Sequence, residues 1–464
     1  MRLCVLIVAM LATTAHARGV TPYLPLNLAP EIERKIERVL ILGEQPLLTR
    51  PIAAATVLDA LPRACERDAA LCEDVRRYLT SLTRTAGISH ASLSIGGGTG
   101  TDTPLPNRHG LSSQSGYEAA AAVYWQPSDR FLVTAGALAY EGDTTPTGTV
   151  ASIGGQYLQI DVGYRDRWWS PSQDNAMLLS TQAATMPSVS VANYTPFTRV
   201  KLRYEAFLAK SSESANIAFG AGTTAGKPRL AGLHLSIEPL AGWSIGVSRI
   251  MQYGGGDRED SLHELFNAFF NPAERDNTGP TSSGDFGNQA ASFTSQFILG
   301  DPLPMTVYFE YAGEDTSRSS NLRLGNAALS AGISFPKLAA NLSATLEFTE
   351  WQNAWYVHTI YRDGLRNEGH VLGHWGADWR VPDDGVGARS MFARVTWEPK
   401  FGTLEASYRQ LDNEEYGVAA YETATQIDAR YSRPWDQVFV GAELTLGRDV
   451  FGDSYSRLGA FIRF

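Results

Sequence analysis

The carboxyl-terminal segment restricts the possible folds more than any other part of the chain. From Leu458 to Phe464, apolar side chains alternate with others, and the chain ends on an aromatic residue. Because successive side chains of a strand point to opposite faces, one face here suits hydrocarbon while the other carries Arg463. Residues 438–446 repeat the alternation. Strands of this kind close outer-membrane barrels, although the edge hairpin of a soluble sandwich also alternates.

The composition argues against a nucleic-acid partner and against a membrane-spanning helix. The formal charge of the 464-residue chain is -10, so it offers no basic stripe for a nucleic-acid partner. Hydrophobic residues make up 44% of the chain, yet beyond the amino terminus no apolar run approaches the roughly 20 residues that a spanning helix needs. Any insertion into a membrane must therefore use strands, because only helices and closed barrels satisfy the backbone in lipid.

The first residues have the pattern of a secretory signal. A basic start is followed by the apolar stretch 3–12 and by a small-x-small site that ends at Ala17. We predict that residues 1–17 are a signal peptide, which contains Cys4. In an oxidising compartment the two remaining cysteines, Cys65 and Cys72, can form a disulfide, with two free thiols as the alternative.

Residues 18–87 are predicted to form a small helical bundle in the periplasm. Apolar residues at helical spacing predict a first helix over 32–40, which Gly43 ends. A second helix is expected to start at Thr49, and a third follows Asp68, a good N-cap residue. Three short amphipathic helices cannot bury their apolar stripes alone, so they should pack on one another.

From residue 88 to residue 464 the period is two, which predicts an outer-membrane β-barrel. In one segment Leu342, Leu346 and Phe348 share a parity, while the other parity is polar and includes Glu347. The contrast recurs along the chain, and the length allows about 16 to 20 antiparallel strands. The longest interruption, 254–292, contains a capping box at its residue 261, which predicts a helix over the barrel mouth.

The sequence contains no local motif for catalysis or for a cofactor. The glycine-rich stretch 96–100 and the stretch that ends at Lys227 do not match a phosphate-binding loop. His370, His374 and Asp378 could converge on a metal, but a polar, aromatic loop is the preferred interpretation. No Gly-x-Ser-x-Gly occurs, although one sequence does not exclude a dispersed triad. We therefore predict a protein without enzymatic activity, metal or cofactor.

Aromatic residues next to Asp, Asn and Arg form the candidate binding site. Flat aromatic faces stack on the C–H side of sugar rings, while amide, carboxylate and guanidinium groups bond to hydroxyls. An interfacial girdle together with a packed lumen is the alternative explanation of the same residues. The predicted glycan-binding residues are Trp168, Trp169, Asp174, Asn175, Tyr361, Arg366, His374, Trp375 and Asp378.

Several of these segments resemble the Wzi family of outer-membrane capsule assembly proteins. The resemblance lies in TPYLPL (21–26), RPIAAAT (50–56), DRWWSP (166–171), NAMLLS (175–180), DNTGP (276–280), GNQ (287–289), YRDGLR (361–366) and LGH (372–374). It implies an eighteen-stranded transmembrane barrel with a helical bundle on the periplasmic side and an occluded lumen. It also implies a surface lectin that ties capsular polysaccharide to the cell.

The sequence thus predicts a non-catalytic surface lectin of the outer membrane that attaches or helps to assemble capsular or extracellular polysaccharide. Its expected partners are that polysaccharide and outer-membrane lipid, and the chain is expected to be a monomer. A passive diffusion porin is the main alternative, and an outer-membrane hydrolase is a less favoured one.

Overall fold

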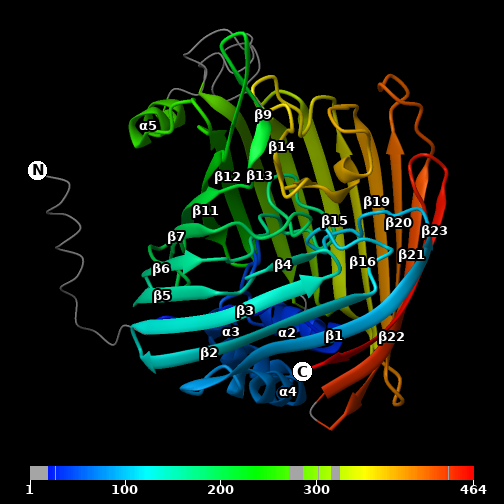
Figure 1. Cartoon of the computed structure of the whole chain (residues 1–464). Helices are drawn as coiled ribbons and strands as arrows, with labels where there is room; N and C mark the ends of the chain where they lie inside the picture. The colour runs from blue at the N-terminus through cyan, green and yellow to red at the C-terminus, as the bar shows by residue number, and fades with distance from the viewer. Residues whose placement is uncertain (1–18, 27, 271–285, 301, 315–323, 437) are drawn as a thin grey trace, which may run out of the picture.

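A computed structural model describes residues 19–26, 28–270, 286–300, 302–314, 324–436 and 438–464. The predicted signal peptide and the DNTGP segment lie outside these ranges. One antiparallel sheet closes on itself, because β1 (Ala86–Gly100) pairs with β2 (Tyr117–Ser128) on one side and with β23 (Ser454–Arg463) on the other. The short strand β4 (Asp143–Thr145) is additional, so the closed wall has eighteen strands and the predicted barrel is confirmed (Figure 1).

Neighbouring wall strands are antiparallel and mostly consecutive in the chain. The other wall strands are β3 (Phe131–Tyr140), β5 (Val150–Gly155), β6 (Leu158–Gly163), β7 (Ser188–Ala192), β8 (Arg203–Lys210), β11 (Arg229–Leu240), β12 (Trp243–Tyr253), β13 (Gly287–Leu299), β14 (Met305–Glu314), β15 (Ala327–Ala339), β16 (Leu342–Trp351), β19 (Ala388–Trp397), β20 (Thr403–Asn413), β21 (Ala424–Trp435) and β22 (Val438–Arg448). Two small hairpins lie outside the wall and are formed by β9 (Ser214–Phe219) with β10 (Gly222–Gly226) and by β17 (Arg366–Asn367) with β18 (His370–Val371).

The predicted alternation matches the two faces of the wall. In β23, Leu458 is 63% exposed, whereas Phe461 on the opposite parity is 6% exposed. In β16, Leu346 and Phe348 are exposed while Glu347 is buried inside the barrel. Exposed apolar side chains recur around the outside of the barrel, which makes a continuous belt for hydrocarbon.

Among the described residues, three helices precede the barrel: α2 (Pro30–Leu42), α3 (Ala54–Arg67) and α4 (Ala69–Thr80). As predicted, Gly43 caps the end of α2, and Asp68 caps α4 by accepting a hydrogen bond from Leu71 N. The predicted start of the second helix at Thr49 is wrong. The backbone of Ile52 and Ala53 is extended and pairs with Tyr23 and Leu24 of residues 19–26, which we call the entry segment, so the helix begins only afterwards.

The helices share one apolar core and cover one end of the barrel (Figure 1). Cys65 and Cys72 are joined by a disulfide across the connection between α3 and α4. The polar side of α2 contacts the inner wall, where Arg34 Nη1 lies 3.2 Å from Glu405 Oε2. Glu37 accepts a hydrogen bond from Ser334 Oγ at 2.7 Å.

A fourth helix, α5 (Leu262–Phe270), lies at the opposite end of the barrel (Figure 1). The predicted cap at Ser261 is present, because Glu264 N donates to Ser261 Oγ at 3.2 Å. The predicted position over the mouth is wrong, since α5 packs against Met251 and Tyr253, whose side chains point outward from β12. Within the described residues, no helix is both long enough and apolar enough to cross a membrane.

Candidate functional site

Two loops leave the same end of the barrel and fold back into the lumen. Residues 164–187 connect β6 to β7, and residues 352–387 connect β16 to β19. An eighteen-stranded barrel is too wide for its inward side chains to fill, so additional chain is needed to close it. We call these two loops the lumen plug. They share one hydrophobic cluster with inward-facing wall residues, and the largest loop side chains in it are Trp169, Met177, Trp355, Tyr356, Trp375 and Trp379.

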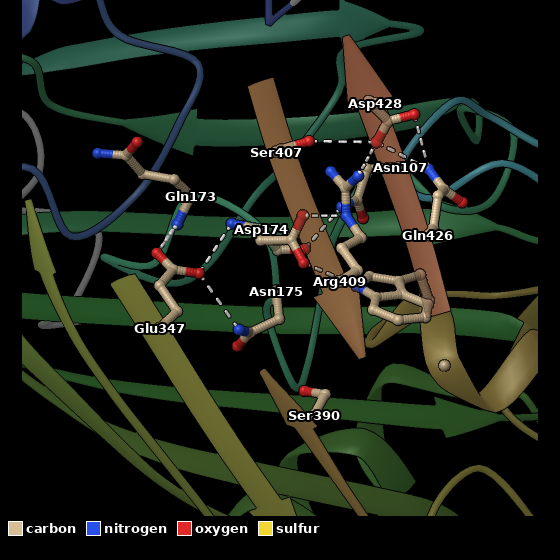
Figure 2. A network of polar contacts seen from close by, with 12 residues as sticks. Asn107, Gln173, Asp174, Asn175, Glu347, Ser390, Ser407, Arg409, Gln426 and Asp428 are labelled. Atoms are coloured by element: carbon tan, nitrogen blue, oxygen red, sulfur yellow. Dashed lines mark hydrogen bonds and ion pairs between the residues drawn. The ribbon is translucent and has the colours of Figure 1, made fainter. Parts of the chain in front are cut away.

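Glu347 of β16 fixes the first plug loop to the wall (Figure 2). Its carboxylate accepts hydrogen bonds from Gln173 N at 2.6 Å, from Asp174 N at 3.0 Å and from Asn175 Nδ2 at 3.3 Å. The hydroxyl of Tyr308 donates to the same carboxylate at 2.6 Å. Three donors from residues 173–175 on one buried carboxylate hold this part of the loop in place, and the Tyr308 hydroxyl of β14 is the fourth donor.

Asp174 joins the two plug loops to each other. Its carboxylate accepts hydrogen bonds from Arg409 Nε at 2.7 Å and from Trp375 Nε1 at 3.0 Å. Arg409 also pairs with Asp428, so the network continues across two wall strands (Figure 2). The structure thus brings the predicted residues Asp174, Asn175 and Trp375 together, and all three are buried.

Asp378 forms a second cluster within the plug, at the end of the 3-10 helix η2 (Trp375–Asp378). Its Oδ1 accepts hydrogen bonds from Arg366 Nη1 at 2.7 Å and from Val371 N at 2.9 Å. Its Oδ2 lies 2.9 Å from His370 Nδ1 and 2.8 Å from Gln182 Nε2. The predicted residues Arg366 and Asp378 are therefore direct partners.

His374 is buried among different neighbours. Its Nδ1 accepts a hydrogen bond from Gly376 N at 3.0 Å, and its Nε2 lies 2.9 Å from Ser390 Oγ. Burial, helped by the positive charge of Arg380, lowers the pKa of His374 to about 3, so the ring is neutral at pH 7. His370 and His374 bond to different groups, and no set of three metal-ligating side chains gathers in the described residues.

The paired tryptophans Trp168 and Trp169 are also buried. Trp168 donates from Nε1 to Ser172 O at 2.9 Å, and its backbone pairs with Arg50, which lies between α2 and α3. Trp169 packs edge-on against Phe207, with 5.3 Å between the ring centroids. The chain covers these two indoles and that of Trp375, so their faces are not exposed for stacking on a sugar ring.

A hollow of about 350 Å³ lies between the second plug loop and residues 211–214, next to Gln252 near the end of β12. We call it the mouth pocket. Of the predicted residues, Tyr361 and Arg366 line it. Its other polar side chains are those of Ser211, Ser212, Glu213, Ser214, Gln252, Asp363 and Asp383.

The mouth pocket is rich in hydrogen-bond acceptors. Glu213 and Asp383 are exposed. Gln252 is 5% exposed and donates to Gly364 O at 3.3 Å, but its Oε1 has no hydrogen-bond partner within the described part of the chain. Arg366 is already bonded to Asp378 and to Gly369 O. A ligand that donates hydrogen bonds, such as a hydroxyl-rich one, suits this set of groups.

Glu213, Gln252 and Asp383 were not among the predicted residues. They come from three segments that only the folded chain brings together. Gln252 is one inward residue of a wall strand, and its sequence pattern matches that of every other inward residue. The serine-rich run 211–214 is a local signal for this pocket, in addition to the segment of the predicted residues Tyr361 and Arg366.

Two comparisons relate the chain to known proteins. The profile of the family described as "Capsule assembly protein Wzi" matches residues 126–448. An uncharacterized 55.8 kDa protein from the cps region of Klebsiella pneumoniae is 34% identical over 102 residues. That match covers 21% of this chain and 19% of the relative, so it spans only a small part of the relative's length.

The fold also resembles a solved structure. Wzi of Escherichia coli is described as an outer-membrane protein involved in group 1 capsule assembly and as a carbohydrate-binding β-barrel. The two chains are 16% identical, and the alignment covers 93% of this chain and 97% of that one with a TM-score of 0.68. At this identity the likeness concerns the fold alone.

Proposed function

Because the chain belongs to the Wzi family of capsule assembly proteins, we propose that it is a non-catalytic lectin of the outer membrane. It attaches or helps to assemble capsular or extracellular polysaccharide at the cell surface. In this proposal residues 1–17 direct export, helices α2–α4 lie in the periplasm, and the mouth pocket faces the outside. The apolar belt around the wall supports the membrane placement.

The main structural support for the proposal is the lumen plug. Its hydrophobic cluster joins loop residues to inward residues of strands around the wall, such as Leu138, Ile250 and Leu411. Separating these groups would expose apolar surface to water, which opposes opening of the lumen. A polymer chain therefore binds on the outer side of the plug and does not pass through it.

The mouth pocket supplies the binding chemistry. Sugar hydroxyls donate to the exposed carboxylates of Glu213 and Asp383. The guanidinium of Arg366 is engaged by Asp378, so neutral, hydroxyl-rich repeats fit the pocket better than uronic acids do. Each contact is weak, but a repeating polymer that engages many copies at the cell surface is retained through high effective concentration.

The test measures how extracellular polysaccharide divides between cell pellet and medium. Deleting the chain should move polymer into the medium while the total stays unchanged. Glu213→Ala combined with Asp383→Ala should cause the same shift at normal abundance of the protein. Glu415→Ala removes an exposed carboxylate outside the pocket and serves as the matched control. An unchanged division after deletion would overturn the proposed function.

A further inference from the structure

Helix α5 is held on the outside of the barrel. Leu265 and Ala268 are buried against outward-facing residues of β11 and β12, which include Ala231, Met251 and Tyr253. The helix therefore does not contribute to the plug, and it adds a separate surface to the outer wall.

An arginine on the outer wall fastens the end of the helix. Arg249 lies on β12 between Val247 and Met251 on the outward parity. Its Nη1 donates to Phe269 O at 2.8 Å and its Nη2 to Ala268 O at 3.0 Å, which are carbonyls of the last helical turn. A cation at a helix C-terminus is stabilised by the helix dipole, and an unpaired arginine on a lipid-facing wall is costly. Arg249 Nη2 also bonds to Gln289 Oε1 of β13, so the helix end and the neighbouring strand together supply hydrogen-bond acceptors for this guanidinium.

The remaining surface of α5 is divided into two stripes. Leu262, Phe266 and Phe270 follow one another at a spacing of four residues, and all are exposed, Phe266 by 61% and Phe270 by 76%. The next stripe around the helix is polar and contains His263 and Asn267, both exposed. At 3.6 residues per turn, the apolar stripe lies between the buried face and the polar stripe. A helix that lies beside a wall, with lipid on one side and water on the other, gives all three faces a suitable environment.

We propose that α5 is an interfacial anchor, which inserts Leu262, Phe266 and Phe270 into the acyl-chain boundary of the outer leaflet. The inference rests on the outer-membrane placement proposed above. The apolar stripe continues the belt of exposed side chains on the strands below it, where Val247 and Phe293 face outward. The position of α5 at the end opposite α2–α4 assigns it to the external leaflet (Figure 1).

The test uses single cysteines that carry a nitroxide label in the full barrel, reconstituted into dioleoyl phosphatidylcholine vesicles. Cys65 and Cys72 are bonded to each other and do not react with the label. Labels at Phe266→Cys and Phe270→Cys should be several-fold less accessible to aqueous nickel chelate than a label at Asn267→Cys, and more accessible to oxygen. Leu262→Cys, the smallest change in side-chain volume, should give the same result if either phenylalanine variant loosens the helix.

A label at Leu346→Cys, in the middle of the belt, distinguishes failure of this inference from failure of the membrane placement. If Leu346 is lipid-exposed while the labels at 262, 266 and 270 are as accessible to nickel chelate as the label at 267, the anchor is overturned alone. If the label at Leu346 is also in water, the membrane placement is overturned together with the anchor.

Discussion

The carboxylate of Glu347 holds residues 173–175 of the lumen plug against the wall. Replacing it in Glu347→Ala leaves the donors on Gln173, Asp174, Asn175 and Tyr308 without their acceptor. Each buried donor left unpaired costs about 1–3 kcal/mol. The amides of residues 173 and 174 should therefore exchange with deuterium at least tenfold faster in the variant, as measured by mass spectrometry.

Glu350→Ala is the matched control for this experiment. Glu350 belongs to the same strand, but it is exposed and pairs only with the exposed Arg389 in the described contacts. Exposed pairs of this kind contribute little stability, so the exchange of residues 173 and 174 should not change. Equal exchange in both variants would show that Glu347 does not hold the loop.

The buried ring of His374 makes the plug sensitive to acid. Its pKa falls from about 6.5 in an unfolded chain to about 3 in the folded plug, so the unfolded state binds more protons between these values. The stability contributed by the neutral ring is complete above pH 6.5 and is lost as the pH falls toward 3, by at most about 1.4 kcal/mol per pH unit. Protection of the Gly376 amide, which donates to this ring, should decline over that range.

The variant His374→Gln separates this titration from that of the carboxylates. The glutamine side chain does not titrate, so protection of the Gly376 amide should depend less on pH between 6.5 and 4. An unchanged pH dependence in the variant would assign the effect to other residues.

At the residue scale, period-two alternation was enough to predict which side chains face outward. Leu346 and Leu458 are exposed as predicted because each strand has only two faces, and one of them meets hydrocarbon. The positions of Trp168, Trp169 and Trp375 were not predictable in the same way. These residues lie in loops, whose burial depends on how 164–187 and 352–387 pack together inside the wall.

At the level of the elements, the stability of the helical bundle depends on the connection between α3 and α4. The disulfide between Cys65 and Cys72 closes a short loop there, and such a cross-link stabilises a fold by roughly 2–3 kcal/mol through the unfolded chain. Reduction should therefore speed amide exchange of the buried Val75 in α4. The barrel strands give the internal control, because their exchange should stay constant; an unchanged rate at Val75 would show that the cross-link adds no local stability.

Some helix boundaries and contacts were predictable from the sequence, and others were not. Local signals placed the cap of α4 at Asp68 and the start of α5 at Ser261, because both depend on hydrogen bonds within one helical turn. The start of α3 and the docking of α5 depend on distant segments. Ile52 pairs with the entry segment, and α5 packs against β12 on the outer wall, and neither contact leaves a local pattern.

On the scale of the whole molecule, the barrel should be closed to ions. The plug shares a hydrophobic cluster with the wall, and α2–α4 cover the other end. In a planar bilayer the intact chain should therefore give no stable unitary conductance, whereas an open porin inserted under the same conditions does. Steady conductance steps from the intact chain would restore the passive-channel alternative.

Weakening the plug should convert this closed barrel into one that opens briefly. Trp375→Ala removes a fully buried indole and its hydrogen bond to Asp174, a change that costs about 3–5 kcal/mol in well-packed cores. Short, flickering conductance is expected, since the wall strands keep their own pairing while the plug unfolds locally. Trp397→Ala removes an outward-facing indole of the wall, and this variant should give no conductance. Because only the inward substitution touches the plug, a difference between the two variants would locate the barrier to ions inside the lumen.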